Sequence, residues 1–292
     1  MKLSIIIPTF NNFHYLKFFL QSLKKNSEFD HEIILHINDG SDGTLEYALK
    51  NNIKHTHSKS NIGLCSSMNK AYTLTTTDYI LYAHDDMYFC KNWDIFLIKE
   101  IKNQNNNQYY LSGTNVSTRH GLINFDCGST YLDFDEKKFH NFCLQDGTPN
   151  LQSSHWAPHL IHKETWNKIG GFSKEFNPGV GSDPDLNMKL WQYGVRIFKG
   201  ISKFKVYHFG SITLRKKNNL PSNKGSNIFL KKWKITPGFF IRHYLNGGII
   251  SNNKIISQKY DGPLSLPKKN LTYLIGLIKC KIKLFYLHIF YK

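Results

Sequence analysis

An apolar run over residues 79–83 ends at the motif His84-Asp85-Asp86, whose two carboxylates can bind a metal ion. Two adjacent carboxylates at the end of a buried strand repel each other, and a bound divalent cation relieves this repulsion. A solvated turn is the competing interpretation of the motif when it is taken alone. The sequence therefore favours a divalent-cation site after residue 83 and leaves a simple turn open.

Three further polar motifs stand where other predicted strands end or helices begin. They are Pro8-Thr9-Phe10-Asn11-Asn12, Asn38-Asp39-Gly40-Ser41-Asp42-Gly43 and Asn61-Ile62-Gly63. Each motif that contains glycine can also be explained by turn chemistry alone. Ligands of parallel α/β sheets bind beyond the carboxyl ends of the strands, so we expect these motifs to meet at one ligand-binding edge.

Alternating strands and helices are expected to position these motifs. Short apolar runs predict strands at 3–7, 32–37, 53–57 and 79–83. Apolar periodicity predicts helices around 16–23 and at 44–51, 64–75 and 93–101. This order predicts an α/β fold with a mostly parallel sheet and helices on both faces. Beyond residue 105 the pattern weakens to a strand at 109–116, helices at 163–169 and 184–193, and one or two strands over 195–209.

Charge is distributed unevenly along the 292 residues. The net charge is +17, yet residues 199–292 hold 19 basic side chains against a single acidic one, Asp261. Hydrophobic residues make up 40% of the chain, which supports a sizeable core and excludes a disordered chain. Five scattered cysteines without a CxxC pair indicate reduced thiols rather than a disulfide framework or a zinc site. We expect a near-neutral domain that carries a basic extension.

The segment 271–291 is strongly apolar but carries Lys279, Lys281 and Lys283 in its middle. Lysines are costly at a bilayer centre, so a helix lying in the membrane interface is favoured over a spanning one. The alternation around these lysines also fits a strand. Nucleic acid would suit the basic charge, but an anionic membrane surface is favoured because the apolar segment gives lipid insertion a mechanism.

Seven motifs, in order, resemble those of family 2 glycosyltransferases and span roughly residues 3–213. They are SIIIPTFN (4–11), NDGSD (38–42), NIG (61–63), YAHDD (82–86), IGGF (169–172), SDPDL (182–186) and VYHFGS (206–211). The resemblance implies a GT-A type (Rossmann-like) fold, a nucleotide-diphosphate sugar donor and a divalent cation. Oxygen ligands suit Mg²⁺ or Mn²⁺, and a mixed aspartate and histidine site tilts towards Mn²⁺.

The resemblance also implies roles for individual residues. Those implied to bind the donor nucleotide are Pro8, Thr9, Phe10, Asp39, Asn61 and Asp86. Asp39 corresponds to the residue that contacts the nucleobase, and Asp85 to the aspartate that binds the metal. The first aspartate of the usual pattern aligns with Ala83, a departure from the family, and Asp86 is the expected substitute at the ribose.

Asp183 corresponds to the general base of inverting family members, although Ser182 replaces the acidic residue before it. A helix N-cap ahead of Pro184 also explains an aspartate there. His208 corresponds to a histidine that completes the metal site, whereas a lone histidine at a strand end is more often packed or exposed. His155 and His159 can share a helical face, but no third ligand is nearby, so we expect structural or acceptor-cleft roles.

We therefore expect a metal-dependent, inverting glycosyltransferase that moves a sugar from a nucleotide-diphosphate donor, a UDP-sugar above all, to a glycan or lipid-linked acceptor. The predicted organisation is a catalytic domain over 1–214 and a basic extension over 215–292. The predicted location is the inner, cytoplasmic face of a membrane, with no nucleic-acid partner. The alternatives are a degenerate non-catalytic relative, a basic-tail binding protein, and a nucleotidyltransferase, whose glycine-rich basic loop is missing after the first strand.

Overall fold

Apolar runs in the first 82 residues form four neighbouring parallel strands of the computed structural model, which describes residues 1–118, 122–210, 224–247, 249–251, 254–256 and 259–290. The strands are β1 (Ser4–Phe10), β2 (Glu32–Asn38), β3 (Lys54–Ser58) and β4 (Tyr79–Tyr82). Their apolar side chains are buried because helices cover both faces of the sheet. Phe10 at the end of β1 pairs with Asn38 at the end of β2, so the polar motifs that follow lie side by side.

The helices between these strands begin close to where the sequence places them. They are α1 (Phe13–Asn26), α2 (Thr44–Lys50), α3 (Leu64–Tyr72) and α4 (Trp93–Lys102). Asn12 precedes α1 but its side chain does not cap the helix. Asp42 from the neighbouring motif does so instead, because its Oδ2 accepts a hydrogen bond of 2.8 Å from the Phe13 N–H.

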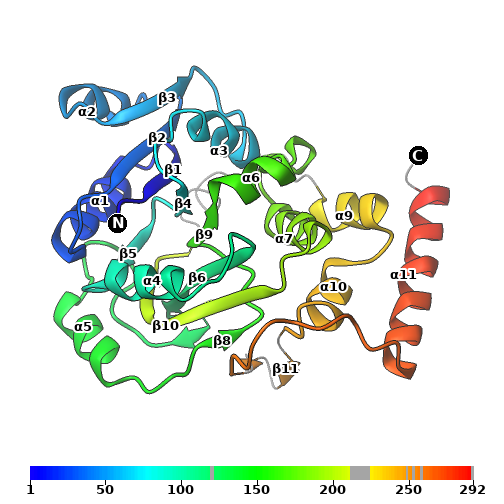
Figure 1. The fold of residues 1–292 in the computed structure, drawn as a ribbon. Helices are drawn as coiled ribbons and strands as arrows, with labels where there is room; N and C mark the ends of the chain where they lie inside the picture. The colour runs from blue at the N-terminus through cyan, green and yellow to red at the C-terminus, as the bar shows by residue number, and fades with distance from the viewer. Residues whose placement is uncertain (119–121, 211–223, 248, 252–253, 257–258, 291–292) are drawn as a thin grey trace.

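The second half of the sheet mixes strand directions. Its strands are β5 (Met87–Phe89), β6 (Tyr109–Ser117), β7 (Ile123–Asn124), β8 (Leu151–Gln152), β9 (His159–His162) and β10 (Ile197–His208). The main path of the sheet has the order β3-β2-β1-β4-β9-β6-β10-β5, and β9 runs antiparallel to both of its neighbours. The region predicted as one or two strands is the single strand β10, which is irregular between Ile201 and Lys205. Figure 1 shows this sheet at the centre of the molecule.

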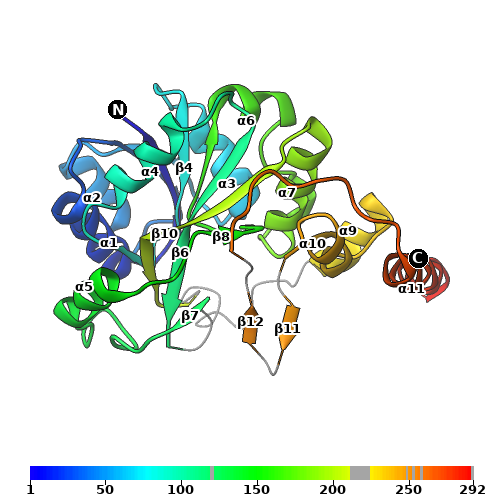
Figure 2. The same ribbon diagram turned by 60° about the horizontal axis from the view of Figure 1, so that its bottom comes forward.

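Helices on the two sides of the sheet include α1 and α4 on one side and α3, α6 and α7 on the other (Figure 2). The elements added here are α5 (Glu136–Gln145), α6 (Lys163–Ile169), the short 3-10 helix η1 (Lys174–Phe176) and α7 (Ser182–Tyr193). His159 belongs to strand β9, and His155 precedes it. The idea that these two histidines share a helical face is therefore wrong, because they are not helical.

The C-terminal part packs against the side of the sheet domain. It contains α9 (Gly225–Trp233), α10 (Pro237–His243), β11 (Ile249–Ser251), β12 (Lys254–Ile256) and α11 (Leu271–Phe290). The Nε1–H of Trp233 in α9 donates a 2.8 Å hydrogen bond to Asp185 of α7, and Lys232 lies 2.9 Å from the same carboxylate. The predicted boundary between residues 214 and 215 lies outside the described residues.

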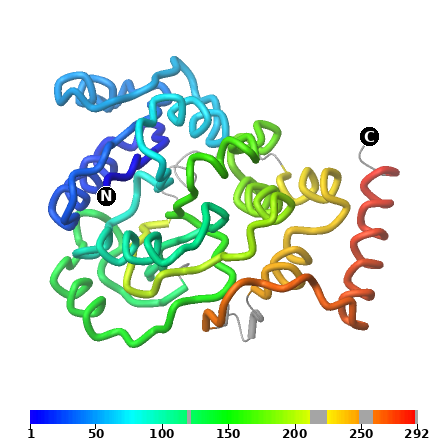
Figure 3. The backbone as a smooth tube through the Cα atoms, viewed as in Figure 1, coloured from blue at the N-terminus to red at the C-terminus, as the bar shows by residue number. Residues whose placement is uncertain are grey.

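The chain returns to the sheet domain before its last helix (Figure 3). The N–H of Tyr260 donates to the carbonyl of Asn150, and that of Leu264 donates to the carbonyl of Arg196. Residues 271–290 are helical, so the strand interpretation of this segment is wrong. Among the described helices, none is both long enough and apolar enough to cross a membrane.

Candidate active site

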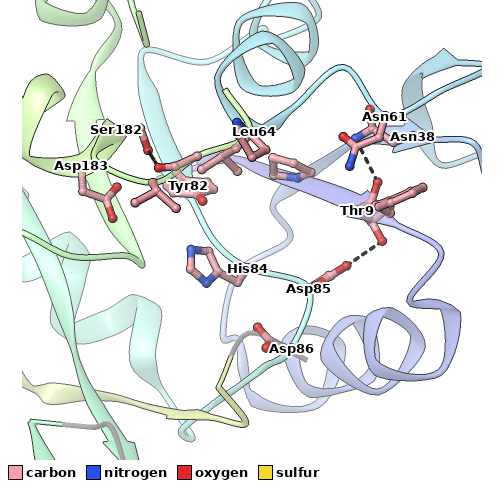
Figure 4. A pocket seen from close by; sticks show the side chains of 15 residues that line it. Thr9, Asn38, Asn61, Leu64, Tyr82, His84, Asp85, Asp86, Ser182 and Asp183 are labelled. Carbon is pink, nitrogen blue, oxygen red and sulfur yellow. Dashed lines mark hydrogen bonds between the residues drawn. The ribbon is translucent and has the colours of Figure 1, made fainter. Parts of the chain in front are cut away.

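A cavity of about 270 Å³ opens where β1 and β4 end, between those strand ends and the loop that leads into α7 (Figure 4). Its lining consists of Pro8, Thr9, Phe10, Asn38, Asn61, Leu64, Tyr82, His84, Asp85, Asp86, Pro178, Gly179, Val180, Ser182 and Asp183. The lining includes every sequence-predicted site residue except Asp39 and His208. The strand-end motifs and the residues before α7 therefore converge on one site, as the order of the motifs predicts.

Asp85 is held by Thr9 near the end of β1 and by Asn12, which follows this strand. Its Oδ2 accepts a 2.7 Å hydrogen bond from the hydroxyl of Thr9, and its Oδ1 accepts one of 3.1 Å from the amide of Asn12. Burial, followed by the neighbouring charge of Asp86, raises the pKa of Asp85 to about 7. Asp85 is the metal ligand that the family resemblance implies, and this role stays a prediction; in this structure both of its carboxylate oxygens accept hydrogen bonds from the protein.

Asp86 instead lies beside His208, which β10 brings back to the end of β4. The Oδ1 of Asp86 is 3.1 Å from Nε2 of His208, and Nδ1 of His84 is 3.3 Å from that same nitrogen. One ligand atom from each residue lies within 4.8 Å of the other two. Burial, with a smaller effect from His208, lowers the pKa of His84 to about 4, so this imidazole is neutral at pH 7. Two imidazoles and a carboxylate that converge in this way fit a divalent transition-metal ion.

The other end of the cavity is built from amide side chains. Asn38 donates to the Thr9 carbonyl at 3.2 Å and accepts from the Ile62 N–H at 2.9 Å, which ties the first and third motifs together. Asn61 accepts a hydrogen bond of 2.9 Å from the Gly63 N–H. Asp39 lies outside the cavity lining, where its Oδ2 accepts a 2.9 Å hydrogen bond from the amide of Asn11.

Asp183 lies across the cavity from Thr9 and Asn61, with Tyr82 beside it (Figure 4). Helix α7 begins at Ser182 with Gly181 as its N-cap, so Asp183 is in the first turn and does not cap the helix. Its Oδ1 is buried and makes no hydrogen bond to the described residues. Burial raises the pKa of Asp183 to about 7, which places it where a general base works near neutral pH.

Several polar atoms under this side of the cavity also lack partners. The Tyr82 hydroxyl, the His159 Nε2 and the Asn187 Oδ1 are buried and make no hydrogen bond to described residues. The ring of His159 packs edge-on against that of Tyr82, with centroids 5.1 Å apart. Native proteins rarely leave buried polar atoms unpaired, so the Tyr82 hydroxyl, whose residue lines the cavity, indicates a site for a ligand or ordered water.

Sequence reasoning did not assign His84, Tyr82 and Asn12 to the site. His84 stands two residues before Asp86 in the motif YAHDD. Residues two apart in an extended segment point to the same side, and this spacing could have indicated that His84 and Asp86 lie together. Tyr82 is an aromatic residue within a predicted apolar strand, like many others in the sequence, and only the fold shows that it lines the cavity. Asn12 ends the motif that follows the first strand, and its contact with Asp85 depends on the packing of β1 against β4.

The chain matches the family model described as glycosyl transferase family 2 over residues 4–154, just over half of its length. It therefore belongs to glycosyl transferase family 2. No curated protein sequence gives a significant match.

Solved glycosyltransferase structures share this fold. Residues 1–349 of S. aureus TarS superpose with a TM-score of 0.52 at 18% identity, over 71% of this chain and 60% of that one. The structure of GalNAc-T7 with UDP, GalNAc and Mn²⁺ gives a TM-score of 0.55 at 17% identity, over 71% of this chain and 44% of that one. The chain thus spans no more than about three fifths of the length of these relatives. These similarities confirm the predicted GT-A fold of a central, mostly parallel sheet flanked by helices.

Proposed function

We propose that this protein is a metal-dependent glycosyltransferase that moves a sugar from a nucleotide-diphosphate donor to a glycan or lipid-linked hydroxyl. The observation that carries the proposal is a single cavity lined both by His84 and Asp86, two of the three candidate metal ligands, and by Asp183, whose buried Oδ1 makes no hydrogen bond to the described residues. Family membership supports the same class of reaction. TarS has been solved with UDP and GalNAc-T7 with UDP and Mn²⁺, which supports a UDP-sugar as the first donor to test.

The donor nucleotide is proposed to bind at the ends of β1 and β2. Pro8, Thr9, Phe10 and Asn61 line this part of the cavity. Asp39, held by Asn11 beside the lining, is the proposed partner of the nucleobase. Asp85 is proposed to keep the β1 end in place through Thr9 and Asn12, so it acts as a positioning residue rather than a metal ligand.

The metal is proposed to bind at Asp86, His208 and His84, with Mn²⁺ favoured because two of the three ligands are imidazoles. A bound divalent cation would neutralise the charge that develops on the departing diphosphate. The chain's contribution is to hold three ligand atoms within 4.8 Å before the donor arrives. His84 is already neutral at pH 7, the protonation state in which imidazole binds a metal.

Asp183 is the proposed general base. It would accept the proton of the acceptor hydroxyl while that oxygen forms a bond to the anomeric carbon and the bond from this carbon to the phosphate oxygen breaks. The nucleoside diphosphate leaves with the electron pair, and a single displacement inverts the anomeric centre. A carboxylate with a pKa of about 7 is a stronger base than an ordinary aspartate and is still ionised in half of the molecules at that pH.

Nucleotide release from UDP-, GDP- and dTDP-sugars with Mn²⁺ tests this function. We expect wild type to release nucleotide from one donor and Asp183→Asn to lose most of the acceptor-dependent rate. The matched control is Asp30→Asn, at an exposed aspartate outside the cavity lining, which should keep full activity. Equal rates for wild type and Asp183→Asn with every donor would contradict the proposal.

The acceptor and a membrane partner remain proposals that follow from the basic C-terminal part. Residues 199–292 carry 19 basic side chains and only one acidic one. A lipid-linked acceptor on an anionic membrane would be drawn to this region. We propose that the protein works as a peripheral enzyme at the cytoplasmic face of such a membrane.

A further inference from the structure

Helix α11 is docked on the protein by one apolar stripe. This inner stripe consists of Tyr273, Leu277, Cys280, Leu284 and Leu287. Gly276 lets α11 approach α10 closely, because a Cβ at this position would lie 2.9 Å from the ring of Phe239. The ring of Tyr273 packs against those of Phe239 and His243, with centroids 5.0 and 5.3 Å away. The helix therefore has a fixed orientation, and its outward face is defined.

That outward face is also apolar. An outer ridge is formed by Leu271, Leu274, Ile275, Ile278, Ile282, Phe285, Tyr286 and Ile289, which are between 45% and 71% exposed. Their spacing of three and four residues places them on one side of the helix, opposite the inner stripe. Figures 1 and 2 show α11 at the edge of the molecule, beyond α9 and α10. Eight large apolar side chains in one exposed row indicate a surface that meets an apolar partner.

A cationic groove of about 460 Å³ runs between α10 and α11. Its charged lining comes from Arg242 of α10 and from Lys279 and Lys283 of α11, with His243 beside them. None of the groove-lining residues is acidic, and helices α9, α10 and α11 contain no aspartate or glutamate. Three permanent cations around a groove without a carboxylate favour an anion, and phosphate is the common biological group that guanidinium and ammonium bind well.

The ridge and the groove together select one kind of partner. A second copy of this chain would place a second set of lysines against the first, which costs electrostatic energy. Nucleic acid would use the cations but has no use for an apolar ridge. A membrane of acidic phospholipids satisfies both, with acyl chains under the ridge and phosphates level with the lysines.

We propose that the groove between α10 and α11 binds the phosphate of an acidic phospholipid headgroup while the outer ridge of α11 inserts among the acyl chains. This lipid site specifies how the protein would bind the proposed membrane partner, and its biological purpose rests on the proposed function. It adds a defined lipid site at Arg242, Lys279 and Lys283. It also gives α11 an orientation in which the helix axis lies along the membrane surface.

Co-sedimentation of the full chain with phosphatidylcholine vesicles, with and without phosphatidylglycerol, tests the site. The groove variant is Arg242→Gln with Lys283→Gln, and the charge-matched control is Lys268→Gln with Lys281→Gln. Lys268 precedes α11, and Lys281 lies on the opposite flank of α11 from the groove, since successive residues turn by about 100°. Both variants lose surface attraction, but only the groove variant loses direct contacts to phosphate. We expect its affinity for acidic vesicles to fall at least roughly tenfold below that of the control.

A ridge variant, Ile278→Asn with Ile282→Asn, should lose binding to vesicles, whereas Leu49→Asn with Leu144→Asn, at exposed leucines elsewhere, should not. Equal losses for the groove and control variants would overturn the lipid site. Binding of wild type to single-stranded DNA but not to acidic vesicles would also overturn it. Binding of Mn²⁺ and UDP, measured without vesicles, distinguishes a failure of the lipid site from a failure of the proposed sugar transfer. A wild type that binds UDP but no vesicles refutes the lipid site alone and leaves the proposed sugar transfer standing.

Discussion

The Nε2 atom of His208 lies 3.1 Å from Oδ1 of Asp86, although 122 residues separate the two in sequence. Two strands create this contact, because β10 pairs with β5 and sets His208 opposite Met87, the residue after Asp86. His84 completes the cluster from the end of β4. The candidate metal site is therefore a direct consequence of the pairing of β10 with β5.

Asp183→Asn is expected to lower the acceptor-dependent turnover by about two to four orders of magnitude, the usual contribution of a general base. The same variant should be more stable than wild type by roughly 1–3 kcal/mol near pH 8, because burial disfavours the charged form of Asp183 and its Oδ1 makes no hydrogen bond to the described residues. Turnover and urea denaturation of the two proteins measure both effects. A loss of activity together with a loss of stability would indicate a structural role instead.

The pH dependence of kcat/KM should show an acid limb near pH 7. Burial raises the pKa of Asp183 to about 7 from an ordinary value of 3.8, so the base is protonated below that pH and the rate falls about tenfold per unit. Binding of Mn²⁺ and UDP over the same pH range shows separately how protonation of the carboxylates near the proposed metal site affects ligand binding. A kcat/KM that stays constant between about pH 5 and about pH 8 would contradict the role of Asp183.

The same shift makes a prediction about stability. The folded protein holds the Asp183 proton up to about pH 7, whereas the unfolded chain releases it near 3.8. The contribution of Asp183 to stability therefore falls as the pH rises through this window. The stability gained by Asp183→Asn should grow over the same interval, which urea titrations at several pH values will show.

Much of the fold follows from the sequence because its signals are local. The runs at Ser4–Phe10 and Glu32–Asn38 are apolar and bounded by polar turns, and they form strands within a few residues of the predicted bounds. The position of β9 could not be predicted, because the four-residue strand His159–His162 carries no alternation and runs antiparallel between two strands distant in sequence. The position of α11 on α10 was equally hidden, since it depends on the close approach at Gly276.

The candidate site, like the fold, could be predicted from the sequence only in part. The motifs after strands were visible, and the cavity brings together Thr9, Asp85 and Asp183 as the sequence analysis expects. The sequence analysis predicts Asp85 as the metal ligand and Asp86 as the residue at the ribose, whereas the proposed metal site uses Asp86. Adjacent residues at a strand end point in different directions, and only the partners, Thr9 for one and His208 for the other, distinguish them.

Tyr82→Phe tests the buried hydroxyl beside Asp183. The hydroxyl has no partner among the described residues, so its removal should leave stability unchanged or raise it by about 1 kcal/mol. We expect a higher KM for the donor or acceptor, because a ligand in the cavity is the available partner for this group. Tyr88→Phe, at a hydroxyl outside the cavity lining, is the control and should leave KM unchanged. An unchanged KM in both variants would remove Tyr82 from the site.

Gly63→Ala is expected to weaken nucleotide binding and to destabilise the fold by roughly 1–3 kcal/mol. Gly63 has a φ of +81°, and a Cβ there would lie 2.5 Å from Oδ1 of Asn177. That oxygen accepts the Cys65 N–H at the start of α3, next to the loop that lines the cavity. Gly170→Ala has a similar φ of +71° but open space around it, so it measures the backbone strain alone. Equal effects of the two substitutions on nucleotide binding would show that the contact with Asn177 is unimportant.

Mn²⁺-dependent nucleotide release by wild type, Asp86→Asn and Glu46→Gln tests the central claim most directly. Glu46 is exposed on α2 and outside the cavity lining, so its substitution controls for the loss of one carboxylate. With the donor that wild type uses, we predict that Asp86→Asn loses Mn²⁺ binding and at least about a hundredfold in rate, the scale of one electrostatic contact in a transition state. Glu46→Gln should match wild type. Equal rates and equal Mn²⁺ affinities for wild type and Asp86→Asn would contradict the account.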